Sequence, residues 1–360
     1  MKSRIYGSAL VIFLMVFVVA CGEDTDADDP VADESVADES VGDEASGEEA
    51  ALEELETVTV GTSRLHTWYW WATIARDEGL MEPYGIELDV VSLGGGDIIV
   101  AAVLSGDAQF AMVTPEGLAA AQEQEPTLQS VGSAIAVNPY TFVVAPEIED
   151  YEDLRGGTIG VLSVGNSADY FTGKLMMREH GLEEGPDYTF VNAGSPAERL
   201  AAMQGGQVQA VLNFEPAAFQ LIDEGMRVLD ASANYPNLAA VETATVISDE
   251  AWYSENRELA ENFMRGFLDS IEWLYDPANR ERAVEILAEE MAVSTEHAEG
   301  TYERFVMELE AWDRDGKVSL ERLQMTFQNA RDAGVEHAPE EDDVEWRFDN
   351  SLIEAIEGDR

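Results

Sequence analysis

Short apolar runs alternate with segments of helical periodicity along the chain from residue 57 onward. Apolar runs of four to eight residues bounded by Gly, Pro or Asn are typical of buried strands, and a 3.6-residue spacing is typical of helices. This alternation predicts an α/β fold with mostly parallel sheets. The expected strands are Thr57–Gly61, Ile86–Ser92, Ala108–Val113, Leu128–Val137, Tyr140–Ala145, Thr158–Leu162, Tyr188–Val191, Val208–Leu212 and Val241–Ile247.

Helices are expected between these strands, and the strand–helix series runs twice with a break at Asn138-Pro139. Two such series predict two lobes, with ligands bound outside the carboxyl ends of the strands. We expect residues 57–139 and 245–360 in lobe 1 and residues 140–244 in lobe 2, with an almost wholly helical segment after Ile247. The expected helices are about Thr67–Glu78, one ending near Gly106, Pro115–Glu123, Ala168–His180, Pro196–Gln204 and Pro216–Glu224.

The first 20 residues have the pattern of a signal peptide. Lys2 and Arg4 precede an unbroken apolar run of 12 residues, Ala9–Ala20, which is too short to span a bilayer as a helix. The junction Val18-Val19-Ala20-Cys21 resembles the lipobox of bacterial lipoproteins. That resemblance implies cleavage before Cys21 and acylation of its thiol, whereas an ordinary secretory signal with an incidental cysteine is the alternative. Because Cys21 is the only cysteine, no disulfide and no cysteine metal site is expected.

Residues 21–56 are expected to form an extended, disordered tether. The tract from Gly22 to Glu56 holds 16 acidic residues and no Lys or Arg, and VADES occurs twice, at Val31–Ser35 and Val36–Ser40. Such a segment buries too little apolar surface to offset its ordering entropy, and its like charges repel one another. A lipid on Cys21 followed by this tether predicts a protein held at the outer face of the membrane yet free to move.

The acidic balance extends to the whole chain, whose formal net charge is −53. Phosphate binding needs clustered Lys and Arg, so this charge excludes nucleic acid as a partner. The negative charge also argues against direct binding of the protein to anionic lipid, apart from the acyl anchor. A surface this acidic suggests a saline, halophilic habitat, in which salt screens the self-repulsion. The hydrophobic fraction of 46% is ample for a large core.

Four stretches in the same order resemble the solute-binding proteins of nitrate/sulfonate/taurine (NMT1/THI5-like) ABC importers. They read IARDEGLMEPYGIELDVVSLGGGDIIVAAVLSGDAQFAMVTPEGLAAA, YEDLRGGTIGVLSVGNSADYFTGKLMMREHGL, NAGSPAERLAAMQGGQVQAVLNFEPAA and DRDGKVSLERLQ. The resemblance implies a two-lobed periplasmic-binding-protein type II fold, in which two crossovers hinge the lobes around a small molecule. It also implies an extracytoplasmic monomer that binds no cofactor, is not an enzyme, and delivers its solute to an ABC permease and its ATPase.

Other motifs do not have the context that their chemistry needs. The glycines of RGGTIGVLSVG precede the strand Thr158–Leu162, whereas a dinucleotide fingerprint follows a strand. DRDGKVSLE has the centre of a calcium loop, but Ala311 and Arg322 occupy the positions of the first ligand and the bidentate glutamate. The four histidines are scattered without metal-ligand spacing, so no metal site is expected. Only His66 falls at the expected site, where a packed or solvated imidazole is the alternative to a ligand contact.

The ligand is expected at the strand ends of both lobes. Ser163–Ser167 opens a helix, whose free N–H groups favour a polar or anionic group, or Asn166 or Ser167 only caps it. Gly94–Gly96 permits close approach of backbone to a ligand, and Arg64 can pair with a carboxylate, sulfonate or nitrate or be merely solvated. The expected ligand-binding residues are Ser63, Arg64, His66, Trp68, Gly95, Gly96, Asp97, Thr114, Asn138, Tyr140, Ser163, Gly165, Asn166, Ser167, Asn192, Asn213 and Glu215.

Four consecutive aromatic residues, Trp68–Trp71, cannot share one face of a helix, because neighbours point about 100° apart. We expect two of them in the core and two at the wall of the cleft, where they would stack on a planar ligand or a cation. Asp97 and Glu215 would repel a purely anionic ligand unless they turn away. The polar loops and the aromatic wall together suit a molecule with a polar or anionic head and a planar or apolar body, so an organosulfonate, an aromatic carboxylate or a pyrimidine fits better than bare nitrate.

Two other functions are compatible with this fold. The fold family includes a pyridoxal-phosphate-dependent pyrimidine synthase, but neither Lys174 nor Lys317 lies where a Schiff-base lysine would be needed. A ligand-sensing receptor domain would use the same cleft, but it is normally fused to a signalling module or a membrane helix. The importer component is the function that the sequence favours.

Overall fold

The computed structural model describes residues 55–359 except 63–65, 95, 166 and 336–337. Contacts divide the chain into Met1–Ala51 and Leu52–Arg360, and all described residues belong to the second unit. The signal peptide, Cys21 and nearly all of the expected tether therefore lie outside the described residues. No described helix is both long and apolar enough to cross a membrane.

The first sheet has five strands, of which four run in one direction and one runs antiparallel to them. β1 pairs in parallel with β2 and β3, and β10 runs antiparallel between β3 and β4. Its spatial order is β2 (Ile86–Ser92), β1 (Glu56–Thr62), β3 (Phe110–Val113), β10 (Ala244–Asp249) and β4 (Leu128–Ile135).

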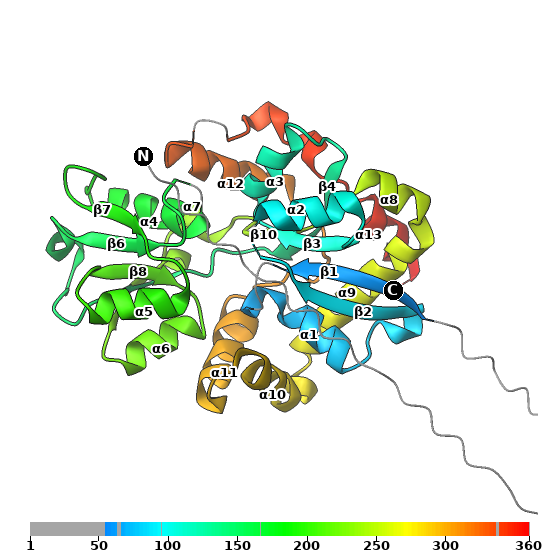
Figure 1. The fold of residues 1–360 in the computed structure, drawn as a ribbon, viewed down its shortest axis with the longest axis horizontal. Helices are drawn as coiled ribbons and strands as arrows, with labels where there is room; N and C mark the ends of the chain where they lie inside the picture. The colour runs from blue at the N-terminus through cyan, green and yellow to red at the C-terminus, as the bar shows by residue number, and fades with distance from the viewer. Residues whose placement is uncertain (1–54, 63–65, 95, 166, 336–337, 360) are drawn as a thin grey trace, which may run out of the picture. The chain divides into compact units, whose positions relative to one another are not determined.

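The second sheet repeats this pattern. β6 pairs in parallel with β7 and β8, and β5 runs antiparallel between β8 and β9. Its spatial order is β7 (Thr189–Asn192), β6 (Thr158–Val161), β8 (Ala210–Asn213), β5 (Thr141–Val144) and β9 (Arg227–Ala231). Helices flank both sheets (Figure 1), so the expected α/β fold is confirmed.

Most α-helices before β10 follow a strand directly, as the pattern predicts. The segment after β10 is helical, and its helices α9 and α10 pack on α1. The helices are α1 (Trp70–Asp77), α2 (Gly96–Ser105), α3 (Pro115–Gln122), α4 (Ala168–Glu179), α5 (Pro196–Gln204), α6 (Ala217–Asp223), α7 (Pro236–Ala239), α8 (Glu250–Glu255), α9 (Arg257–Tyr275), α10 (Arg280–Met291), α11 (Thr295–Tyr302), α12 (Leu320–Asp332) and α13 (Ser351–Ile356). Short helices are η1 (Thr67–Tyr69), η2 (Glu82–Tyr84), η3 (Tyr151–Leu154), η4 (Ser232–Asn234), η5 (Pro277–Asn279), the π-helix η6 (Glu303–Glu308), η7 (Glu341–Asp343), η8 (Glu345–Arg347) and η9 (Glu357–Asp359).

Two details of the expected element pattern were wrong. β9 was not expected, because this edge strand is only partly buried and its sequence RVLDA lacks a period-two pattern. The helix expected from Thr67 starts as the 3₁₀ turn η1, and its α-helical part begins only at Trp70. This change of geometry matters because it decides where the four consecutive aromatic rings point.

The two chain crossovers between the sheets lie side by side. Asn138 N donates to Ala239 O (3.2 Å), and Thr243 Oγ1 donates to Val137 O (2.6 Å). Ser232 Oγ donates to Asn138 O (2.9 Å). Because both crossovers are joined by hydrogen bonds, any rotation of one sheet relative to the other must involve this paired segment.

A buried ion-pair network fixes the second crossover. Glu242 has no exposed side-chain surface, and its carboxylate accepts from Ser133 Oγ (2.5 Å) and from Arg322 Nε (3.1 Å). Arg322 also binds Asp313 at 2.6 Å. Burial raises the pKa of Glu242 to about 7 even though Arg322 and Ser133 oppose that shift. The DRDGK segment therefore supplies a structural partner for Arg322 on α12.

Candidate functional site

Residues that follow strands of both sheets meet in one cluster. We call Thr67, Trp68, Thr141, Asn213, Phe214 and Glu215 the strand-end cluster. Thr67 Oγ1, from the segment after β1, donates a 2.7 Å hydrogen bond to the backbone O of Glu215, which follows β8. Both atoms are buried. The carboxyl ends of β1 and β8 thus face each other directly, which is where α/β folds bind ligands.

The apolar part of the cluster is a pair of stacked rings. Trp68 lies against Phe214 with ring centroids 5.3 Å apart and planes 25° apart. The His66 imidazole is 5.6 Å from Phe214, and the Tyr140 ring is 5.7 Å from it. Phe305 of η6 contacts Phe214 at 6.2 Å. Phe214 is therefore the ring at which aromatic side chains of both sheets meet.

The polar part of the cluster is the carboxyl group of Glu215. Its Oε1 accepts from Thr141 Oγ1 at 3.0 Å, and its Oε2 is buried without a partner. Burial raises the pKa of Glu215, whereas the hydrogen bond from Thr141 and the charge of Arg304 act to lower it. Arg304 itself is paired with Glu308 at 2.9 Å.

A buried ion pair holds the strand ends of the second sheet in place. Arg199 on α5 binds Asp169 on α4 at 2.6 Å, and their side chains are only 7% and 3% exposed. Arg199 also donates to Asn213 Oδ1 (2.9 Å) and to Gly194 O (3.1 Å). Asp169 Oδ2 accepts from Leu162 N at 2.8 Å. The Arg199 guanidinium is thus bonded to other groups of the protein, and its role is to position the loops after β6, β7 and β8.

The expected helix start at Ser163–Ser167 is a closed loop. Ser167 Oγ donates to Ser163 O (2.7 Å) and accepts from Ser163 N (3.1 Å), so it makes no side-chain cap on α4. Asn192 Oδ1, at the end of β7, accepts from Val164 N at 2.7 Å. Gly165 has a φ of +80°, a conformation that favours glycine. Asn192 therefore supports this loop, and its side-chain oxygen is already occupied.

Tyr140 and Asn138 lie at the first crossover. Asn138 Nδ2 donates to Thr172 Oγ1 of α4 at 2.8 Å, and both residues are buried. Burial raises the pKa of Tyr140 well above its usual value, with further contributions from Asp169 and Glu116. Enclosure by the surrounding protein also raises the pKa of Glu116 to about 7, although part of its side chain reaches solvent. Arg199 acts in the opposite direction on Tyr140, but the net effect raises the pKa, so Tyr140 is held as a neutral phenol.

Three expected residues at the strand ends of the first sheet make no hydrogen bond to the strand-end cluster among the described residues. Gly96 and Asp97 are exposed in the first turn of α2, and Thr114 caps α3 by accepting from Gly117 N at 3.3 Å. Of the remaining expected residues, Ser63, Arg64, Gly95 and Asn166 lie outside the described residues. The structure thus brings five of the expected residues together: His66, Trp68, Tyr140, Asn213 and Glu215. Three more are linked to these through hydrogen bonds that involve Asp169 and Arg199, namely Ser163, Ser167 and Asn192.

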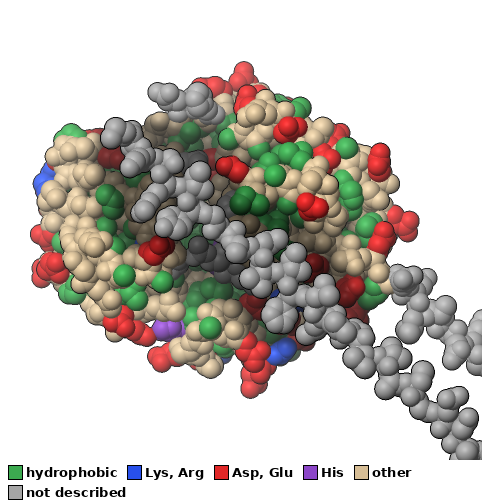
Figure 2. Space-filling view, viewed as in Figure 1, with side chains coloured by type: hydrophobic (Ala, Val, Ile, Leu, Met, Phe, Trp, Pro, Cys, Tyr) green, Lys and Arg blue, Asp and Glu red, His purple; other side chains and the backbone are tan. Residues whose placement is uncertain are grey.

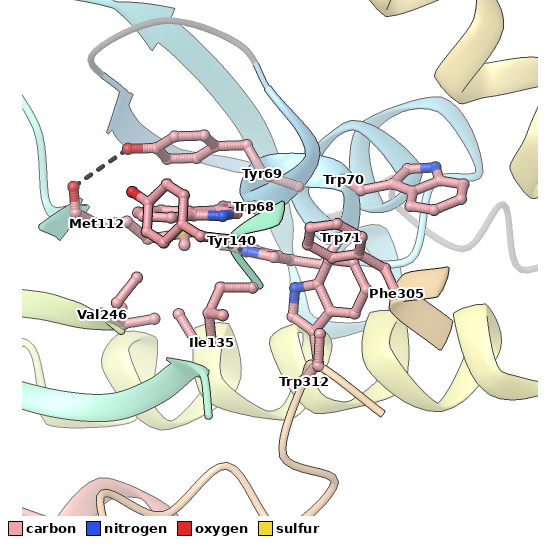
Figure 3. Packing of buried hydrophobic residues seen from close by; sticks show 14 of the residues in the cluster. Trp68, Tyr69, Trp70, Trp71, Met112, Ile135, Tyr140, Val246, Phe305 and Trp312 are labelled. Carbon is pink, nitrogen blue, oxygen red and sulfur yellow. Dashed lines mark hydrogen bonds between the residues drawn. The ribbon is translucent and has the colours of Figure 1, made fainter. Parts of the chain in front are cut away.

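The aromatic run divides differently from the expected two and two. All four rings are buried, and Figure 3 shows them in the core with the hydrogen bond from Tyr69 to Met112. Trp70 and Trp71 also have hydrogen-bond partners. Tyr69 Oη donates to Met112 O (3.1 Å), Trp70 Nε1 to Ala283 O (3.1 Å), and Trp71 Nε1 to Met112 Sδ (3.3 Å). Trp68 Nε1 has no partner. The 3₁₀ turn directs Trp68 alone toward the second sheet.

A second contact between the two halves joins α6 to α11. Phe219 stacks on His297 with centroids 5.9 Å apart, and His297 Nε2 lies 2.8 Å from Asp223 Oδ2. Gly300 faces the Phe219 ring so closely that a Cβ there would meet it at 2.7 Å. His180 instead stacks on Tyr151 at 3.6 Å, and His337 lies outside the described residues. These histidines therefore pack against aromatic rings.

Several residues of the site were not predicted from the sequence. Phe214 and Thr141 adjoin residues that were expected, but a packed aromatic ring and a strand threonine carry no local signal. Arg199, in contrast, has a local signal in the sequence. It lies on the same helix face as Met203, four residues further along the chain, and both residues are buried. A cation on an apolar helix face requires a buried partner, and Asp169 is that partner.

Comparisons with known proteins give one family and many structural neighbours. A family model described as NMT1/THI5 like matches residues 71–280, more than half of the chain. No curated protein matches. A structure from Bordetella bronchiseptica RB50 has a TM-score of 0.68 at 17% identity, covering 85% of this chain and 98% of its own.

Two further neighbours differ in function. The periplasmic aliphatic sulphonate binding protein SsuA from Escherichia coli has a TM-score of 0.65 at 18% identity, covering 83% of this chain and 99% of its own. The desulfurization enzyme DSZB has a TM-score of 0.62 at 18% identity, covering 85% and 100%. These likenesses show the periplasmic-binding-protein fold for this chain, and they show that the fold serves both binding and catalysis.

Proposed function

Because this chain belongs to the NMT1/THI5-like family, we propose that it is the lipid-anchored, extracytoplasmic solute-binding component of an ABC importer. In this proposal residues 57–139 and 245–360 form one lobe and residues 140–244 the other. The observation that carries it is the meeting of strand ends from both sheets at Thr67 and Glu215. A solute held there contacts both lobes, so binding favours the closed arrangement that a permease recognises.

The proposed solute is a small organic molecule with a polar or anionic head and a planar or apolar body. The stacked rings of Trp68 and Phe214 support a planar body, and Asn213 and Glu215 supply polar contacts for a head group. An organosulfonate, an aromatic carboxylate and a pyrimidine all have this form. The sulphonate named for the Escherichia coli neighbour falls in the first class.

The proposed partners are an ABC permease and its ATPase, with the protein acting as a monomer. The enzyme DSZB shares the fold, but no described residue supports a covalent reaction at the strand-end cluster. Lys174 is paired with Glu184 at 3.0 Å, and Lys317 with Glu357 at 2.6 Å. Neither lysine belongs to the cluster. A sensor domain with the same cleft remains the alternative, and permease and ATPase genes beside this one would favour the importer.

The anchoring part of the proposal rests on Cys21 and the acidic tract that follows it. Acidic side chains also dominate the charged residues on the face drawn in Figure 2, as expected for a protein of saline habitat. Replacing Cys21 by Ala should leave the precursor uncleaved or release the mature protein from membranes. Wild-type protein found only in soluble fractions, without added lipid mass, would contradict anchoring.

The binding role is tested by mass spectrometry of small molecules released when protein purified under native conditions is denatured. A stoichiometric organic solute that rebinds to the refolded or fresh protein supports the proposal. Repeated recovery of no solute, together with no response to extracts of the source organism's growth medium, would refute it.

A further inference from the structure

We propose that the solute is planar and uncharged and carries both a hydrogen-bond donor and a hydrogen-bond acceptor. A carboxamide and an amino-substituted nitrogen heterocycle are examples. Glu215 binds the donor of the solute, and Asn213 binds its acceptor. This inference rests on the proposed function, because it specifies the ligand of the same site. It distinguishes this protein from neighbours named for sulphonates.

The primary evidence is a set of three buried polar atoms without partners. They are Trp68 Nε1, Asn213 Nδ2 and Glu215 Oε2, on side chains of residues that are 9%, 3% and 4% exposed. A buried polar group without a hydrogen bond costs about 1–3 kcal/mol, so such groups are rare and need an explanation. Three of them in one small region indicate a missing partner molecule.

These atoms belong to one local structure. Thr141 is the ladder partner of Asn213 and also donates to Glu215 Oε1, so the two side chains flank the same strand residue. Trp68 follows Thr67, which is bonded to the backbone of Glu215. The Trp68 ring lies on Phe214, between Asn213 and Glu215 in sequence. The three side chains are therefore linked to one another through Thr141, Thr67 and Phe214.

The hydrogen-bond types specify the partner. Trp68 and Asn213 offer N–H donors, and an ionised Glu215 accepts only. A ligand that satisfies all three must carry acceptors and at least one N–H or O–H. A sulfonate has acceptors alone, so it would fit only if Glu215 carried a proton.

The charges around the cluster favour an uncharged ligand. The described arginines next to it are already paired, Arg199 with Asp169 and Arg304 with Glu308. Each of these cations is thus balanced by a carboxylate, whereas Glu215 adds an unbalanced one. Among the described charged groups at the cluster, an anion would therefore meet net negative charge in a buried setting, where electrostatic repulsion is strong.

The ring pair accounts for the planar body. Two aromatic faces that hold a flat molecule between them lie about 7 Å apart, twice the ordinary carbon–carbon contact distance. Trp68 and Phe214 are 5.3 Å apart and come from different sheets. At this distance the two rings leave no room for a ligand between them, so a planar ligand stacks on Trp68 in place of Phe214.

The test uses calorimetric titration with three probes of similar size: cytosine, benzamide and benzenesulfonate. The variants are Glu215→Gln, and Glu147→Gln as a control at an exposed carboxylate. We expect cytosine or benzamide to bind and benzenesulfonate not to bind. Glu215→Gln should weaken the N–H probe about ten- to a hundredfold, as loss of a hydrogen bond to a charged group does. Glu147→Gln should leave binding unchanged.

The sign of the Glu215→Gln effect decides between ligand classes. A glutamine mimics the protonated acid, so it should preserve or improve binding of an anion. Benzenesulfonate binding to the wild type, unchanged or tighter in Glu215→Gln, would overturn the inference while leaving the solute-binding role intact. Failure of both N–H probes at millimolar concentration would also overturn it. The binding role itself fails only if no solute of any class binds.

Discussion

Trp68 of η1 stacks on Phe214, the residue after β8, with ring centroids 5.3 Å apart and planes 25° apart. The two rings come from segments that follow strands of different sheets. Trp68 is the one member of the run Trp68–Trp71 that faces the second sheet in the described contacts. Its environment therefore depends on how the two sheets lie relative to each other.

The first prediction concerns this tryptophan. Ligand binding should change the intrinsic fluorescence, because Trp68 exchanges Phe214 for the ligand as its stacking partner. Trp68→Phe should abolish that change while the ligand still binds, since a phenyl ring remains for stacking although the pyrrole part of the indole and its N–H are lost. Trp346→Phe, at an exposed site, is the matched control and should keep the signal. A full ligand-induced change in Trp68→Phe would contradict this placement.

The second prediction concerns the contact between α6 and α11. Gly300→Ala places a methyl group 2.7 Å from the Phe219 ring and so pushes the two helices apart. Alanine is the better helix former by about 1 kcal/mol, which offsets part of the cost of the overpacked contact. Ligand affinity should fall several-fold, because the closed arrangement becomes strained.

A double mutant checks the cause. Phe219→Ala removes the ring that the new methyl group would meet, so Gly300→Ala should cost no further affinity in that background. Additive losses of affinity in the double mutant would show that the α6–α11 contact is not the origin of the effect.

The third prediction concerns the buried charge at the second crossover. Arg322→Met leaves Glu242 without its cation inside the protein, and breaking one partner of a buried ion pair costs about 3–5 kcal/mol. Urea unfolding should report a loss of this size. Arg314→Met is the control, because Arg314 is 63% exposed and 3.7 Å from Glu310. Equal effects of the two substitutions would refute the structural role assigned to Glu242.

The fourth prediction is a pH dependence that Glu215 introduces. Burial raises its folded-state pKa above the ordinary value of 4.5, so the folded protein holds an extra proton from about pH 4.5 up to that raised value. Over this window the free energy of unfolding should fall as pH rises, since the folded state binds more protons than the unfolded state. Below pH 4.5 both states are protonated and this contribution is constant.

Glu215→Gln removes this titration and leaves the other buried carboxyls in place. The difference in thermal midpoint, variant minus wild type, should therefore increase as pH is raised above about 4.5. Thermal midpoints that run parallel across the range would show that Glu215 is not held in a setting that disfavours its charge.

The sequence predicted the sheets well because strand and helix signals were strong and local. Apolar runs such as Ile86–Ser92 coincide with a strand to the residue, and Pro196–Gln204 coincides with α5. The edge strand β9 was missed because it is half exposed. The family resemblance predicted from ordered stretches of sequence is confirmed by the family model.

The site was predicted only in part, because its geometry depends on contacts that are distant in sequence. Asn213 and Glu215 were expected from their place after a strand. That they meet Trp68 depends on the 3₁₀ turn η1, and nothing in the letters TWYWW distinguishes this turn from a regular helix. The Arg199–Asp169 pair likewise joins two helices whose packing the sequence alone did not specify.

The central claim is that one solute contacts both sheets at the strand-end cluster. Hydrogen exchange of the backbone amides, measured with and without the solute identified by mass spectrometry, tests this directly. We predict that the solute slows exchange both in the η1–α1 segment after β1 and in residues 213–215 at the end of β8, at the same ligand concentration. Slower exchange confined to one sheet, or none in either segment, would contradict the claim.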